Sequence, residues 1–256
     1  MVPGRRYTLA LCRVRAKQSM AHVVRTLLSR LVALGIRIKL VLLDRGFYSV
    51  QVIRDLITGE LPFIMPAVKR GKKPATLGGP TGTYALAAEK QGRWTPYTLR
   101  SAHEGQVDFD LAVVCHNTRG HRGRHRRETL LYATWGLTHR PLSWIRQTYR
   151  RRVGIESSYR QVHQARIRTS SRNPVLRLLF VGVALVLRNV WVWLHAEVMA
   201  QPQRGARQLR PQSLRFARVL LWLILEIAKH YRLLRQVVAY RDIYERAQAF
   251  GIIFNY

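Results

Sequence analysis

Two carboxylates in this sequence are placed where they could bind a metal ion. Asp44 follows residues 36–43 (IRIKLVLL), an aliphatic and β-branched run that is typical of a buried strand. An Asp at this position is most often a turn former, and Asp44-Arg45-Gly46 is a common turn sequence. The carboxyl end of a parallel strand is also where α/β folds bind ligands, so Asp44 is a candidate metal ligand.

The second carboxylate, Glu156, belongs to a periodic row of polar residues. The row has spacings of 3, 4, 3 and 4 residues and consists of Tyr149, Arg152, Glu156, Tyr159 and His163. Such spacing places these residues on one side of a helix. Arg152 and Glu156 could simply form an exposed ion pair worth about 0.3–0.5 kcal/mol. Taken together with Asp44, however, the row favours a site where Glu156 binds metal while Tyr149 and Arg152 contact phosphates.

The chain is strongly basic, with 44 Lys and Arg against 13 Asp and Glu and a formal net charge of +31. A compact protein with this charge repels itself unless a polyanion shares its surface, and nucleic acid is the usual polyanion. The densest basic segment lies at 118–127, and it reads either as a solvated loop or as a DNA-backbone contact, the interpretation that we favour. Its arginines are Arg119, Arg122, Arg124, Arg126 and Arg127.

The elements that must position these residues follow an α/β order. Apolar periodicity predicts alternating strands and helices at 6–14 (strand), 20–34 (helix), 36–43 (strand), 49–57 (helix) and 61–68 (strand). Residues 84–117 alternate as antiparallel strands do, and from Ser143 onward the pattern is helical, with a break at 201–211. The apolar segment 175–198 contains Arg188, so we expect a buried core helix and no membrane association.

These residues carry a resemblance to a known family. The segment 42–48 (LLDRGFY) resembles the second-aspartate motif of the DDE transposases of insertion sequences. Tyr149, Arg152 and Glu156 match the intervals of the helix that gives the YREK group of these transposases its name. His163 stands where that group has Lys, and it could still contact a phosphate as a cation.

The resemblance implies an α/β, RNase H-like fold with a β-rich insertion between Asp44 and Glu156. It implies a partial catalytic core at 1–68, the insertion and basic loop at 69–131, a return to the core at 132–200 and C-terminal helices at 201–256. Asp44 and Glu156 would be catalytic residues and ligands of Mg²⁺ (or Mn²⁺), with two ions in an intact site. The reaction implied is phosphodiester hydrolysis and strand transfer in DNA transposition.

The partners that the resemblance implies are double-stranded DNA, both transposon ends and target, and a second copy of the chain. Tyr149, Arg152, His163 and the arginines of 118–127 would contact this DNA. We expect a cytoplasmic, nucleoid-associated protein, since the two cysteines do not indicate a disulfide scaffold.

No Asp or Glu precedes Asp44, whereas the family has a first catalytic Asp on an earlier strand. We therefore expect an N-terminally truncated chain with impaired activity. Two alternatives stay open: a non-catalytic DNA-binding remnant of a transposase, and a basic structural protein of the ribosome or nucleoid. The last predicts that Asp44 and Glu156 lie far apart.

Overall fold

The computed structural model describes residues 6–75, 78–119, 125–199, 201–203, 206–208 and 215–231. The chain divides into two compact units. Thr8–Tyr159 form the first, which we call the sheet unit, and Met1–Tyr7 with Arg160–Tyr256 form the second, which we call the C-terminal unit. The division between the units falls within one helix.

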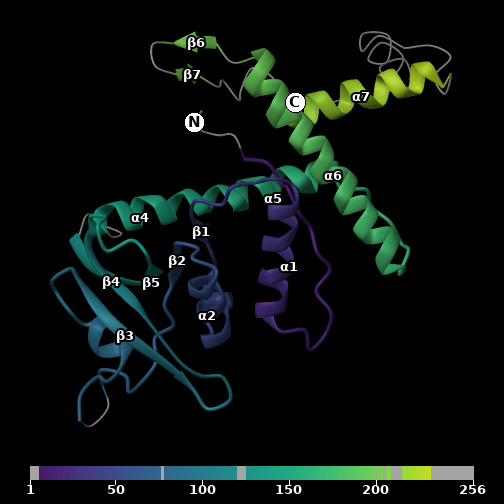
Figure 1. Ribbon diagram of the computed structural model, residues 1–256. Coiled ribbons are helices and arrows are strands. Elements are labelled where there is room, and N and C mark those ends of the chain that lie inside the picture. Colours follow the sequence, from purple (N-terminus) through teal and green to yellow (C-terminus); the bar gives the residue numbers. More distant parts are fainter. Residues whose placement is uncertain are drawn as a thin grey trace, which may run out of the picture. The chain divides into compact units, whose positions relative to one another are not determined.

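The sheet unit is built on one five-stranded sheet with the order β1-β2-β5-β4-β3 (Figure 1). Its strands are β1 (Val41–Leu42), β2 (Phe63–Pro66), β3 (Arg93–Ser101), β4 (Gly105–Arg119) and β5 (His125–Trp135). Only β1 and β2 pair in parallel, and the other neighbours are antiparallel. Its helical segments are α1 (Met20–Ala33), η1 (Arg45–Phe47), α2 (Val50–Thr58), α3 (Thr83–Ala87), α4 (Leu142–Arg150) and η3 (Arg151–Val153). The mixed sheet with helices confirms the predicted α/β class.

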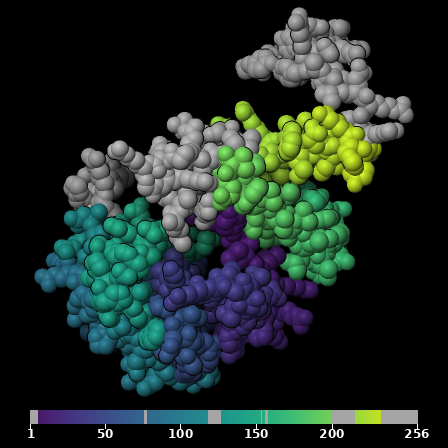
Figure 2. Space-filling model, turned by 45° about the horizontal axis from the view of Figure 1, so that its top comes forward, coloured from purple at the N-terminus to yellow at the C-terminus, as the bar shows by residue number. Residues whose placement is uncertain are grey.

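Helices cover both faces of this sheet because its central strands are apolar on both sides. Phe63 and Met65 on β2 pack on one face with Ile53 and Leu56 of α2. Ile64, which lies between them in β2, points to the opposite face and packs in a second cluster with residues of α4. In the space-filling view the purple, blue and teal residues of this unit pack against one another (Figure 2).

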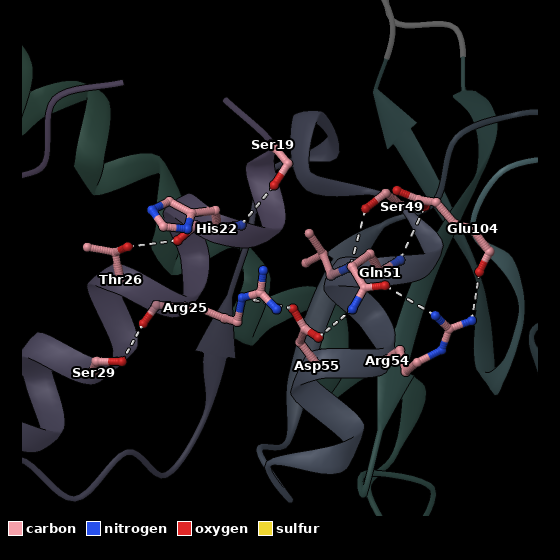
Figure 3. Close-up of polar contacts among 11 residues, drawn as sticks. Ser19, His22, Arg25, Thr26, Ser29, Ser49, Gln51, Arg54, Asp55 and Glu104 are labelled. Atoms are coloured by element: carbon pink, nitrogen blue, oxygen red, sulfur yellow. Dashed lines mark hydrogen bonds and ion pairs between the residues drawn. The ribbon is translucent and has the colours of Figure 1, made fainter. Parts of the chain in front are cut away.

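The first two helices begin at serine caps and are tied together by polar contacts (Figure 3). Ser19 accepts a hydrogen bond from the His22 amide at 3.2 Å. Ser49 accepts from the Val52 amide at 3.3 Å and so caps α2. The Arg25 Nε lies 3.7 Å from Asp55 Oδ2 and so joins α1 to α2.

The predicted strand at 6–14 is not formed. Residues 6–15 pair with no other strand of the described chain, and Leu9 and Val14 leave about half of their side-chain surface exposed. Alternating apolar residues form a strand only where a neighbour completes the hydrogen-bond ladder. The predicted strand 36–43 is likewise reduced to Val41–Leu42, which pairs on one side only, with β2.

The C-terminal unit contains a long helix and short elements after it. They are α6 (Pro174–Leu194), the π-helical turn η4 (His195–Met199), β6 (Gln201–Gln203), β7 (Ala206–Gln208) and α7 (Phe216–His230), while α5 (Gly154–Ala165) holds the division between the units. Trp191 and Val192 pack against Phe216. The buried Arg188 donates to the Arg6 carbonyl at 2.7 Å and to Gln161 at 3.2 Å.

The helix α6 is less buried than the sequence predicts, because Val175, Leu179 and Val186 are exposed. By length and composition alone, Pro174–Val198 meets the requirement for crossing a membrane, and it is one such helix among the described residues. The core helices of soluble proteins meet the same requirement.

A hydroxyl clamp closes the loop between β2 and α3. Thr83 is fully buried, and its Oγ1 accepts from the Arg70 amide at 2.6 Å and donates to the Val68 carbonyl at 3.0 Å. Gly82 has φ +56°, and a Cβ there would lie 2.8 Å from the Arg70 carbonyl oxygen. The clamp therefore fixes the backbone on both sides of Lys69.

We expect Thr83→Val to lower the free energy of unfolding by about 1–3 kcal/mol, because it removes the hydroxyl that pairs with the partly buried Arg70 amide and Val68 carbonyl. Thr83→Ser keeps the hydroxyl and loses one methyl group, so it should cost only about 1 kcal/mol. Urea unfolding followed by circular dichroism measures both. Equal losses in the two variants would contradict a role for the hydroxyl.

Candidate active site

Asp44 lies just beyond the end of β1, where the β1–β2 pairing places it. The Leu43 amide donates to the Ile64 carbonyl at 3.2 Å, which extends the ladder up to the residue before Asp44. Asp44 then caps η1, because its Oδ1 accepts from the Arg45 amide at 2.7 Å. Its side chain is 55% exposed, so the carboxylate is open to solvent and to a ligand.

Two members of the polar row lie against this carboxylate. Arg152, in η3, has its Nη2 3.4 Å from Asp44 Oδ1. The same guanidinium lies over the ring of Tyr149, with 5.6 Å from its carbon to the ring centroid. The structure thus brings together Asp44, Tyr149 and Arg152, although more than 100 residues separate Asp44 from the other two.

The phenol of Tyr149 stays protonated at neutral pH. Burial is the main cause that raises its pKa and nearby Asp44 raises it further, while Arg152 acts in the opposite direction. Burial also raises the pKa of Tyr132 to about 12, and the two rings are in contact with centroids 5.2 Å apart. A protonated phenol can donate a hydrogen bond to an anion, and so can the guanidinium beside it.

The rest of the row lies in α5. Glu156 is the third residue of that helix, and its side chain lies outside what the structure describes. Tyr159 is 62% exposed, and His163, exposed as well, belongs to the C-terminal unit. The prediction of one regular helix for the row is wrong in detail, since the 3₁₀ turn η3 separates α4 from α5 directly before Gly154.

The carboxylate oxygens of Asp44 are suitable ligands for a hard divalent cation. Both contacts described for this carboxylate use Oδ1, so Oδ2 has no partner among the described residues. Mg²⁺ prefers carboxylate oxygens and keeps several waters, for which an exposed Asp is suited. Within the described ranges no group of three or more His, Cys, Asp or Glu side chains occurs.

The basic segment at 118–127 is described only in part. Arg122 and Arg124 lie outside the described residues, and for Arg119 and Arg126 the structure gives the backbone, in β4 and β5, without the side chain. Arg127 is exposed on β5, where it faces Asn117 of β4. It is the one arginine of this segment whose described side chain can be placed relative to Asp44.

Arg127 lines a groove of about 650 Å³ that also contains Arg45 and Tyr149. Sequence reasoning missed this groove and two of its cations, Arg45 and Lys69. Both follow the ends of strands, Arg45 after β1 and Lys69 after β2, as Asp44 does. That shared position was the signal that could have identified them.

The last residue of the LLDRGFY motif, Tyr48, packs in the hydrophobic core. Tyr48 is 6% exposed and packs edge-on against Phe109 with ring centroids 6.3 Å apart. Burial raises its pKa, and its hydroxyl has no hydrogen-bond partner among the described residues. The aromatic end of the motif therefore anchors η1 while its acidic end is exposed.

We expect Asp44→Asn to change the free energy of unfolding by less than about 1 kcal/mol, since exposed ion pairs contribute little and Asn also caps helices. Asp44→Ala loses the cap too and should cost about 0.5–2 kcal/mol. Urea titration of both variants measures this. A loss well above 2 kcal/mol in Asp44→Asn would mean that the charge is structural.

The comparison with protein families agrees with this geometry. The model of the family described as "Transposase DDE domain" matches residues 6–189, and no curated protein matches the chain. The match covers most of the chain and includes Asp44, Tyr149, Arg152 and Glu156. The mixed sheet with its helices agrees with the RNase H-like fold of DDE transposases. This chain belongs to the transposase DDE domain family.

Proposed function

We propose that the chain is the catalytic part of a DNA transposase of the insertion-sequence YREK group, acting by Mg²⁺-dependent phosphodiester hydrolysis and strand transfer. The observation that supports this most is the contact between Asp44 and Arg152, which joins the two motifs in space. The DNA substrates are transposon ends and target, which implies a nucleoid location, and a second copy of the chain is the natural partner at paired ends.

In this proposal Asp44 and Glu156 hold the metal ions. Bound there, Mg²⁺ (or Mn²⁺) would supply Lewis-acid activation of a water or a DNA 3′-hydroxyl and stabilisation of the leaving oxygen. Arg152 presents a planar fork of N–H donors beside Asp44, which suits the non-bridging oxygens of a phosphate. Tyr149 donates its phenolic hydrogen from the same side, and His163 contacts the DNA backbone further along α5.

We further propose that this 256-residue chain is a weak catalyst by itself. The resemblance implies three carboxylates for two ions, and no Asp or Glu precedes Asp44. With one ligand fewer, the second ion is held poorly. The same observation supports the second candidate, a DNA-binding remnant without catalysis.

Cleavage of a supercoiled plasmid that carries the DNA flanking the coding sequence tests the role of the carboxylates. We expect slow Mg²⁺-dependent nicking, lowered at least roughly 100-fold by Asp44→Asn or Glu156→Gln. Asp108→Asn, at an exposed Asp of β4, is the matched control and should retain the full rate. Fast nicking that Asp44→Asn abolishes would contradict the proposed weak activity but not the role of Asp44. Nicking that Asp44→Asn leaves unchanged would contradict the role of Asp44.

Metal binding gives a readout that does not require activity. We expect the chain to lower the free Mn²⁺ signal in electron paramagnetic resonance, and Asp44→Asn to weaken this binding at least about 10-fold. Asp108→Asn should bind Mn²⁺ as the unchanged chain does. Binding that survives in Asp44→Asn would place the metal elsewhere. Mn²⁺ binding at Asp44 without any nicking would favour the remnant.

A further inference from the structure

We propose that the groove beside Asp44 holds a single strand of DNA next to the reacting phosphate, with Arg45, Lys69 and Arg127 contacting its backbone. The inference rests on the proposed function for the identity of the ligand as DNA. It adds a path for the strand and two phosphate-binding residues: Arg45, next to Asp44 in the motif 42–48, and Lys69, which lies outside both motifs.

The three cations reach the groove from three separate parts of the sheet unit. Arg45 is the first residue of η1, held there by the capping Asp44. Lys69 lies in the loop that Thr83 clamps through Val68 and Arg70. Arg127 is placed by the β4–β5 pairing. Positive charges fixed from three directions are suited to successive phosphates of one strand.

The lining of the groove also contains apolar residues, among them Pro66, Ala67, Ala87 and Leu130. A duplex hides its bases in the stack, whereas an unpaired strand exposes bases and sugars that pack on apolar surface. The volume of about 650 Å³ lies within the usual range of ligand sites. Glu128 is the acidic residue of the lining, and its carboxylate lies 3.7 Å from His116 Nε2.

The groove is continuous with the candidate active site. Tyr149 lines the groove, and the guanidinium of Arg152 lies over its ring and beside Asp44. Arg45 likewise lines the groove and donates its amide to Asp44. A strand in the groove therefore runs directly up to the Asp44 carboxylate.

The test compares two probes in EDTA, where cleavage cannot occur: a 30-base-pair duplex, and the same duplex with a six-nucleotide single-stranded extension. Fluorescence anisotropy gives the affinity at several salt concentrations for the full chain. The variants are Lys69→Ala, Arg127→Ala and the double variant. Arg100→Ala, at an exposed arginine of β3 that does not line the groove, is the matched control for charge.

We expect each groove variant to lose about 5-fold in affinity for the extended probe at 0.1 M salt, since each phosphate contact on a single strand contributes a salt slope of about 0.7. The double variant should lose about 25-fold, and its slope should fall by about 1.4. Loss on the plain duplex should be smaller, and Arg100→Ala should change either affinity by less than about 2-fold.

Equal effects of Arg100→Ala and the groove variants would overturn the inference, because the loss would then reflect net charge alone. Equal losses on both probes would also overturn it and would assign the groove to duplex DNA. Asp44→Asn separates the inference from the proposed function. Its binding should be retained in EDTA even where its cleavage is lost, so absence of catalysis leaves the groove result standing.

Discussion

The site depends on the pairing of β2 with its two neighbours. β2 pairs in parallel with β1 and antiparallel with β5, and its Phe63, Ile64 and Met65 are fully buried. The parallel partner carries Asp44 beyond its end, and the antiparallel partner carries Tyr132, against which Tyr149 packs. A shift of β2 by one residue would exchange its apolar faces and separate these groups.

Repulsion between positive charges destabilises the same region that the β2 pairing stabilises. A chain of net charge +31 repels itself, and Asp44 lies beside the cation Arg152 and directly before Arg45 in the chain. The Asp44 carboxylate offsets this repulsion through its contact with the Arg152 guanidinium. A DNA phosphate bound near Asp44 would reduce this repulsion further. The positive charge that destabilises the free protein therefore stabilises its complex with DNA.

Much of the fold could be predicted from the sequence, because local patterns decided it. The helices expected at 20–34 and 49–57 and the antiparallel strands after residue 84 all follow from apolar periodicity or alternation. The strand expected at 6–14 failed because its pattern is right but the ladder it needs is not supplied by any described neighbour. The prediction of one regular helix for the row from Tyr149 to His163 was wrong, because a 3₁₀ turn interrupts the α-helix directly before Gly154.

The candidate site was predictable only in part. Residue spacing brought Tyr149 and Arg152 into one group, and the family resemblance joined that group to Asp44. The groove was not predictable, because Lys69 and Arg127 are 58 positions apart in the sequence and meet only through the sheet and the Thr83 clamp. Position after a strand end could have marked Lys69 as a candidate, but no local pattern indicates that it meets Arg127.

The clamp at Thr83 also bears on how the chain can diverge. The Thr83 hydroxyl accepts from the Arg70 amide and donates to the Val68 carbonyl, so the segment between Arg70 and Thr83 has its two ends joined. Doubling the length of a closed loop costs only about 0.6 kcal/mol. Insertions or deletions can therefore accumulate beyond the clamp, altering that surface between relatives, while Lys69 keeps its place.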